Sequence, residues 1–268
     1  MTRLHVFHTG SVIVDRAIPY HEDRPLAALG VGRSVDKKLT LPVSCYLIEH
    51  PRGNILIDTG WNTRYAYERP KRFGGALDRI SAPLVLEGEG IDSKLAACGL
   101  SPTDIDCVYL SHLDFDHTSG IALVRGARRF MTARAEVADA RRAPLRYVRS
   151  TWADVDIEPF DYQEGGIGPV GRSLDVFGDG SVVLVSTPGH THGHASVRVG
   201  TPERYVLLAG DAVYTQRSVR EHIMPGFTVD EAAAKASVEW VCACAADPAC
   251  LTVIPNHDPD TEEQVIDL

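Results

Sequence analysis

Four potential metal ligands lie within six residues of one another, immediately after a short apolar segment. The apolar segment covers residues 106–110, and the ligands that follow it are His112, Asp114, Asp116 and His117. Asp and His side chains are rarely buried in proteins unless they are paired or coordinate a metal. The end of a strand is a rigid support for functional groups. Carboxylates and imidazoles at this density therefore predict a divalent metal site.

Three further segments of the chain repeat this arrangement. Each is a short apolar run that leads to an Asp or His, with Gly or Pro turns near most of them: residues 182–186 before His190, residues 205–208 before Asp211, and residues 251–254 before His257. Taken singly, such a histidine is more often a hydrogen-bonded structural residue than a ligand. Four strands that all end in Asp or His indicate one convergent site at a common edge of the sheets.

The elements that must position these residues alternate between short strands and longer helical patterns. Further strands are expected at residues 43–49 and 54–57, and helices at residues 93–98 and 229–245. No internal repeat or low-complexity tract is visible. This alternation is typical of an α/β or α+β protein.

Length and composition fit one globular domain spanning residues 1–268. Of the 268 residues, 44% are hydrophobic and 24% are charged, as in ordinary globular proteins. The N-terminus lacks the apolar run of a signal peptide and no stretch resembles a membrane span, so a cytoplasmic location without a membrane partner is expected. The net charge of -9 argues against nucleic acid as a partner. The six cysteines lie mostly in apolar stretches, which favours free thiols in a reducing compartment.

Two stretches fit the strand and helix patterns poorly. Residues 61–90 and 142–166 are rich in polar and aromatic side chains and are only weakly periodic. Long segments of this kind are often functional. We expect them to act as lids over the site, with solvent-exposed connections as the alternative.

The motifs together resemble the metallo-β-lactamase superfamily, in which a H-x-H-x-D-H motif, a His after a T-P-G turn, an Asp in a G-D motif and a last His occur in this order. Within it, the N-acyl-homoserine lactonases are most similar. That similarity rests on five stretches within residues 41–258: Leu41-Pro42-Val43-x-Cys45-Tyr46-Leu47, Asp58-Thr59-Gly60, His190-Thr191-x-Gly193-His194-x-Ser196, Asp211-x-x-Tyr214-Thr215 and Pro225-Gly226-Phe227. The resemblance implies an α+β fold, a four-layer αββα sandwich.

The resemblance also implies a ligand set for two divalent metal ions. Metal one would be bound by His112, Asp114 and His190, metal two by Asp116, His117 and His257, and Asp211 would bridge them. Asp114 stands where the superfamily motif has its second His. Because a carboxylate is a harder ligand than an imidazole, zinc is expected on isolation but manganese, iron or cobalt are alternatives. Asp114 either binds metal one directly or turns away and leaves that metal weakly held.

The activity implied is hydrolysis of a small ester or lactone by a metal-bridging hydroxide, with an N-acyl homoserine lactone, and hence quorum quenching, as the leading candidate. Asp116 would carry a proton to the leaving alkoxide. Tyr214 would donate a hydrogen bond to the carbonyl, unless it only packs. The partner would be a small molecule, and the protein a monomer or homodimer. A thioester hydrolase of the glyoxalase II type and a non-catalytic metal-binding module remain alternatives.

Residues around the motifs are expected to support the ligands. Asp58 is expected to orient a ligand histidine or to cap its turn, and His194 to support the site without binding metal. His192 is expected to face water. Phe115 is similar to an aromatic residue that lines the lactonase pocket.

Overall fold

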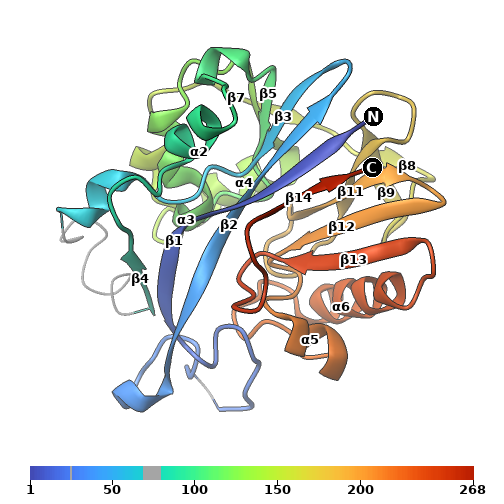
Figure 1. Cartoon of the computed structure of the whole chain (residues 1–268). Coiled ribbons are helices and arrows are strands. Elements are labelled where there is room, and N and C mark those ends of the chain that lie inside the picture. The colour runs from blue at the N-terminus through green and yellow to red at the C-terminus, as the bar shows by residue number, and fades with distance from the viewer. Residues whose placement is uncertain (25, 69–79) are drawn as a thin grey trace.

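Two β-sheets lie face to face in the computed structural model, which describes residues 1–24, 26–68 and 80–268. Helices cover the outer face of each sheet, so the layers follow the order helix, sheet, sheet, helix (Figure 1). The expected four-layer αββα sandwich is confirmed.

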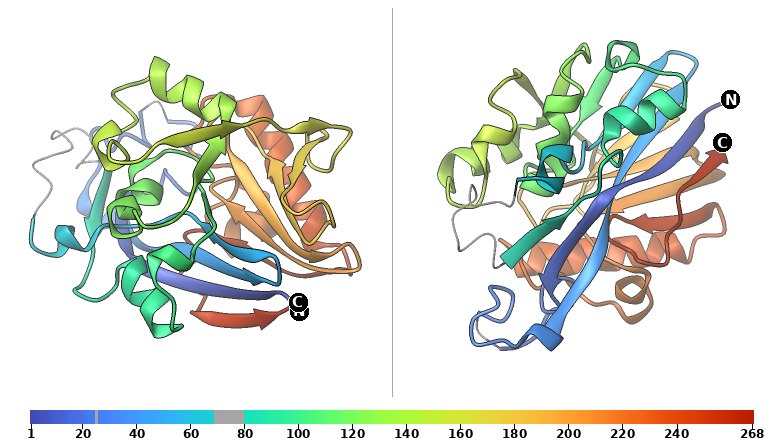
Figure 2. Two further views of the ribbon diagram at one scale, coloured as in Figure 1. Left: turned by 90° about the horizontal axis from the view of Figure 1, so that it is seen from above. Right: turned by 60° about the vertical axis from the view of Figure 1, so that its left-hand side comes forward.

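The first sheet has eight strands among the described residues, in the order β14-β1-β2-β3-β5-β6-β7, with β4 paired to β1. Its strands are β1 (Arg3–Asp15), β2 (Lys38–His50), β3 (Gly53–Ile57), β4 (Ser81–Leu84), β5 (Cys107–Tyr109), β6 (Phe130–Ala133), β7 (Ile157–Phe160) and β14 (Gln264–Asp267). Because β14 pairs with β1, the two chain ends lie side by side (Figures 1 and 2).

The second sheet has six strands in the described residues, in the order β13-β12-β11-β10-β9-β8. Its strands are β8 (Gln163–Glu164), β9 (Arg172–Asp175), β10 (Val182–Ser186), β11 (Ala195–Thr201), β12 (Arg204–Gly210) and β13 (Cys250–Pro255). The described α-helices are α2 (Ile91–Ala97), α3 (Phe115–Thr118), α4 (Arg134–Arg142), α5 (Gln216–Glu221) and α6 (Glu231–Ala245). None of the helices within the described ranges is long and apolar enough to cross a membrane.

Alternation along the strands explains why both faces of each sheet are buried. In β2, Tyr46 packs into the cluster between the sheets, whereas the next residue, Leu47, packs with α2 on the outer face. In β12, Leu208 points inward and Leu207 packs against Val238 of α6. Successive side chains of a strand point to opposite faces. A strand buried on both faces is therefore a continuous apolar run.

The strand directions bring the candidate ligands to one edge. β10 and β12 both pair antiparallel with β11, and β13 is parallel to β12, so these three strands run in the same direction. Their carboxyl ends lead to His190, Asp211 and His257. The first sheet joins them where the Ala195 N–H donates to the Ser111 carbonyl at 2.9 Å. The convergence expected at a common edge is confirmed.

The two stretches expected to be lids are partly regular structure. Residues 81–84 form β4 and residues 157–160 form β7, so neither stretch is a plain connection. Both stretches also reach the site, because Ile80, Ser81, Leu145 and Arg146 line its pocket. Residues 69–79 of the first stretch lie outside the described residues. A lid function stays a prediction for both stretches.

Candidate metal centre

Two buried triads of potential ligands lie at the shared edge of the sheets. In each triad, one donor atom from every residue lies within 4.8 Å of the other two. Site one is formed by His112, His190 and Asp211, and site two by Asp116, His117 and His257.

Asp211 lies between the two triads. Its Oδ1 is 3.4 Å from His117 Nε2 and 3.3 Å from His257 Nε2. Its Oδ2 is 3.7 Å from His190 Nε2 and 4.0 Å from His112 Nε2. One carboxylate oxygen thus faces each site, which is the arrangement that a bridging ligand needs.

The four site imidazoles are all held through Nδ1. The groups in contact with Nδ1 are Ser111 Oγ for His112 at 3.0 Å, Asp58 Oδ2 for His117 at 2.8 Å, the Phe227 carbonyl for His190 at 2.8 Å and the Pro42 carbonyl for His257 at 2.8 Å. Donation from Nδ1–H leaves the lone pair on Nε2, the atom that points into the site. Burial, followed by the neighbouring His117, lowers the pKa of His112, which favours the neutral form that binds a metal.

The inward-pointing atoms fit a pair of cations. His112 Nε2, His117 Nε2 and Asp211 Oδ1 are buried without a hydrogen-bond partner among the described residues. A buried polar atom left unpaired costs about 1–3 kcal/mol. Divalent metals at sites one and two would satisfy all three atoms, and imidazole with carboxylate is a ligand chemistry suited to zinc and its neighbours.

A tight turn after β3 holds the site-two histidine. Asp58 has a positive φ of 58°, and its Oδ1 accepts the Ser111 N–H at 2.8 Å while its Oδ2 faces His117. The Gly120 N–H donates to the Gly60 carbonyl at 2.8 Å, and a Cβ at position 120 would lie 2.1 Å from the Thr59 oxygen. Asp58 thus contacts a histidine of the triads, as expected, and metal binding by that histidine stays a prediction.

His194 holds the backbone of Asp211 in place. Its Nε2 accepts the Asp211 N–H at 2.9 Å, and its Nδ1 contacts Thr187 Oγ1 at 2.8 Å. Burial, followed by the nearby His190, lowers the pKa of His194 to about 3, so this ring stays neutral. By contrast, the His192 side chain is exposed, as expected, and contacts Asp139 Oδ2 through Nδ1 at 2.7 Å.

Asp114 lies beside site one but is held by an arginine. Its Oδ2 is 3.0 Å from His190 Nε2 and 3.5 Å from His112 Nε2. Both of its oxygens accept hydrogen bonds from Arg146, from Nε at 2.8 Å and from an NH2 group at 2.7 Å. Sequence reasoning missed Arg146. The available signal was the extra carboxylate itself, because a buried acid needs a counter-charge. Ligation of a metal by Asp114 stays a prediction.

A pocket with a volume of about 290 Å³ opens onto both sites. Asp114, Asp116, His190, Asp211 and His257 form its polar end, and its apolar wall includes Val12, Val14, Ile18, Phe115, Leu145 and Phe227. Tyr214 is stacked on His257 with 5.0 Å between ring centroids. Burial, followed by the Asp211 and Asp116 carboxylates, raises the pKa of Tyr214 well above its ordinary value, so the hydroxyl keeps its proton.

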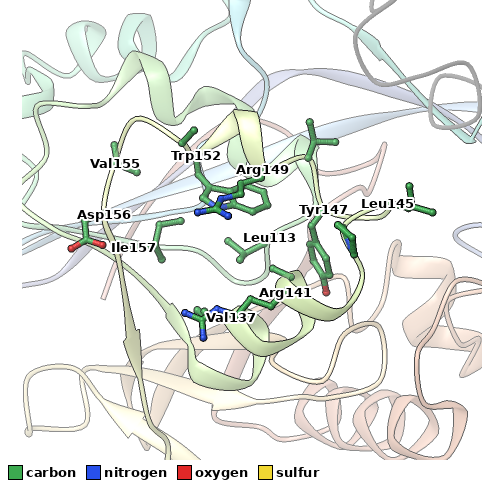
Figure 3. Close-up of a pocket in the computed structure, with 14 residues that line it drawn as sticks. Leu113, Val137, Arg141, Leu145, Tyr147, Arg149, Trp152, Val155, Asp156 and Ile157 are labelled. Carbon is green, nitrogen blue, oxygen red and sulfur yellow. The ribbon is translucent and has the colours of Figure 1, made fainter.

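A second hollow, of about 660 Å³, is lined by Leu145 and Tyr147, the two sequence neighbours of Arg146 (Figure 3). Trp152 and Val155 contribute apolar surface, and Arg141 and Arg149 also line it. It contains none of the predicted ligands, and Leu145 borders both hollows. The chemistry therefore belongs to the smaller pocket.

Comparison with known proteins agrees with this geometry. The sequence model of the Metallo-beta-lactamase superfamily matches residues 40–249. The chain therefore belongs to this superfamily and is a metal-dependent hydrolase. It is 30% identical over 227 residues to the N-acyl homoserine lactonase AttM of Azorhizobium caulinodans, covering 82% of this chain and 83% of the relative. It is 37% identical over 177 residues to the probable metallo-hydrolase Rv2300c of Mycobacterium tuberculosis, covering 63% and 56%.

Among solved structures, an N-acyl homoserine lactone hydrolase with the product N-hexanoyl-L-homoserine at its catalytic metal centre is similar to this chain. The TM-score is 0.76 at 25% sequence identity, and the match covers 96% of this chain and 94% of that chain. The resemblance to lactonases inferred from the motifs is confirmed. Superfamily membership and the two triads together imply two divalent metals.

Proposed function

We propose that the protein opens the ring of a small lactone by hydrolysis, with an N-acyl homoserine lactone as the leading substrate. The observation that carries this proposal is the apolar-walled pocket that opens directly onto the paired ligand triads. The lactonase relatives described above support the same substrate class.

The pocket favours an uncharged substrate. Among the described residues that line the pocket, Arg146 carries the one guanidinium, and its bidentate contact with Asp114 balances its charge. A volume of about 290 Å³ lies just below the range of about 300–1,000 Å³ for small-molecule sites, which favours a small substrate. An acyl chain can lie along Val12, Val14 and Ile18 while the lactone ring reaches the triads. Among the described residues of the pocket wall, no arginine or lysine besides Arg146 is available to pair with an anionic substrate such as a charged thioester.

The residues of the site divide the reaction between them. Sites one and two would hold the metals, which when bound supply an acidified water and polarise the substrate carbonyl. The oxygen of water adds to the carbonyl carbon, the ring C–O bond breaks, and the proton from water ends on the leaving oxygen. Asp116, at the polar end of the pocket, carries that proton. Tyr214, protonated and buried beside His257, donates to the oxyanion.

A hydrolysis panel with metal analysis tests the proposal. The purified protein is assayed with N-acyl homoserine lactones of several chain lengths, a simple γ-lactone, an aryl ester, a glutathione thioester and a phosphodiester. We expect the lactones to have the highest kcat/KM. A thioester or phosphodiester preferred by more than about tenfold, roughly 1.4 kcal/mol of transition-state stabilisation, would contradict the lactonase assignment.

The variant His257→Ala ties the activity to the site. It removes a ligand of site two, so we expect loss of both metal and activity. His192→Ala is the matched control, because this exposed histidine contacts Asp139 and belongs to neither triad. Equal activity in the two variants would reject the metal assignment. We propose zinc as the metal on isolation, with manganese, iron or cobalt as alternatives.

A further inference from the structure

Arg146 is fixed in place on several sides. Besides its two hydrogen bonds to Asp114, it donates from an NH1 group to the His190 carbonyl at 3.0 Å. Its guanidinium carbon lies 4.9 Å from the Phe227 ring centroid and 5.4 Å from that of Tyr147. The side chain is only 11% exposed. A guanidinium held in this way is part of the structure of the site.

The same guanidinium lies directly beside site one. The NH2 group that donates to Asp114 Oδ2 is also 3.1 Å from His190 Nε2, the ligand atom of site one. Arginine has only donors and keeps its positive charge in proteins. A cation bound to His190 Nε2 would therefore meet a second positive charge at short range.

Site two has different neighbours. In the described residues, the side-chain hydrogen bonds and ion pairs of His117 and His257 join them to the carboxylates of Asp58, Asp116 and Asp211, to Ser111 and Asn256, and to the Pro42 carbonyl. None of these partners is an arginine or a lysine. The field at site two thus attracts a cation, whereas at site one Arg146 neutralises the nearest carboxylate and repels the metal.

We propose that Arg146 makes the two metal sites unequal. Site two holds a resident metal tightly. Site one takes its metal weakly and exchangeably, because that metal must compete with the guanidinium for Asp114 Oδ2 and His190 Nε2. Arg146 is thus a positioning residue that sets metal affinity. The inference rests on the metal-binding part of the proposed function and not on the lactone substrate.

Titration of the metal-free full chain with zinc, in competition with a chromophoric chelator, measures both affinities without any activity assay. For the wild type we expect one tight equivalent and a second that binds on the order of 100-fold more weakly. Two equivalents within tenfold of each other would overturn the proposal. A failed substrate panel would leave this result untouched, so the two proposals fail separately.

Arg146→Leu tests the cause of the difference. Removing the guanidinium frees Asp114 as a ligand, so the zinc affinity of site one should rise at least about tenfold. Site two should keep its affinity, which shows that the variant has a native fold. The double variant Arg146→Leu/Asp114→Asn should lose this gain, because a neutral amide is a poorer ligand.

Arg149→Leu is the matched control, since Arg149 lies three residues away and lines the other hollow (Figure 3). Equal zinc affinities of site one in Arg146→Leu and Arg149→Leu would refute the role of Arg146. If Arg146→Leu does not fold, the ratio of the two wild-type affinities still decides whether the two sites are unequal, and a ratio below tenfold overturns the proposal.

Discussion

Replacing Asp58 by Asn should weaken metal binding at site two while changing almost nothing in shape. Asn tolerates the positive φ of 58° that Asp58 adopts, so the backbone of the turn can stay as it is. The substitution removes one charge and turns one acceptor into a donor. The site-two ligand His117 is the residue that must respond.

The hydrogen bonds fix which atom changes. The Ser111 N–H donates to Asp58 Oδ1 at 2.8 Å, so an oxygen must remain at that position. The new amide nitrogen then takes the place of Oδ2, which lies 2.8 Å from His117 Nδ1. Two donors would face each other unless His117 moves its proton to Nε2, which is the atom that binds the metal. The opposite amide orientation places the amide nitrogen against the Ser111 N–H instead.

Either arrangement weakens the tight site. Loss of such a supporting partner costs about 10- to 100-fold in metal affinity, which corresponds to about 1.4–2.8 kcal/mol. This range agrees with the cost of about 1–3 kcal/mol for one unsatisfied buried group. Zinc titration against a chromophoric chelator measures this loss of affinity at site two.

Asp139→Asn is the matched control for this experiment. Asp139 also accepts a histidine Nδ1 contact, at 2.7 Å from His192, but that histidine is exposed and outside the triads. We expect wild-type metal affinity in the control. Affinities of Asp58→Asn and Asp139→Asn within threefold of each other would refute the reasoning.

Three other predictions concern catalysis and stability. Tyr214→Phe should lower kcat about 10- to 1,000-fold with metals retained, since an oxyanion donor is lost. An unchanged kcat would show that Tyr214 has only a packing role. Gly120→Ala should destabilise the protein by about 1–3 kcal/mol in urea unfolding, because its Cβ would lie 2.1 Å from the Thr59 oxygen; wild-type stability would contradict that contact. The pKa of His194, about 3 when folded, lies below its unfolded value of about 6.5, so its stabilisation is present at pH 7 and declines as pH falls. Protonation of His194 alone should remove about 2 kcal/mol of stability from the metal-free protein between pH 7 and pH 5, and His194→Gln should lack this contribution; identical pH profiles of the two proteins would refute it.

The strands that the sequence predicted are those with uninterrupted apolar runs. β10 was expected at its observed bounds, and β12 and β13 nearly so, because their apolar runs allow few other conformations. β1 was not expected. Its sequence includes His5, His8 and Gly10, which interrupt the apolar pattern, and its pairing with β2, β4 and β14 stabilises it. Pairing between distant segments is a property of the fold, so a local pattern cannot reveal it.

The same distinction applies to the site. The convergence of His190, Asp211 and His257 could be predicted because each follows a recognisable strand. Arg146 follows α4 in a weakly periodic stretch, and nothing local distinguishes it from Arg141 or Arg149. Only its contact with Asp114, 32 positions earlier in the chain, gives it a role. Ligands at strand ends can thus be predicted from sequence, whereas a counter-charge that a loop brings to them cannot.

The pairing of Asp114 with Arg146 leads to a last prediction about restoring the usual motif. If Asp114 acted only as a harder ligand, Asp114→His alone would supply the missing imidazole and strengthen metal binding at site one. In this structure that change would leave the Arg146 guanidinium without its carboxylate, still 3.1 Å from His190 Nε2. An unpaired buried cation beside a metal site is unfavourable, so we expect Asp114→His to bind the second zinc no better than the wild type. Asp114→His/Arg146→Leu should bind it at least tenfold better. If Asp114→His alone reached the site-one zinc affinity of Asp114→His/Arg146→Leu in the same chelator competition, Arg146 would not oppose metal binding at site one.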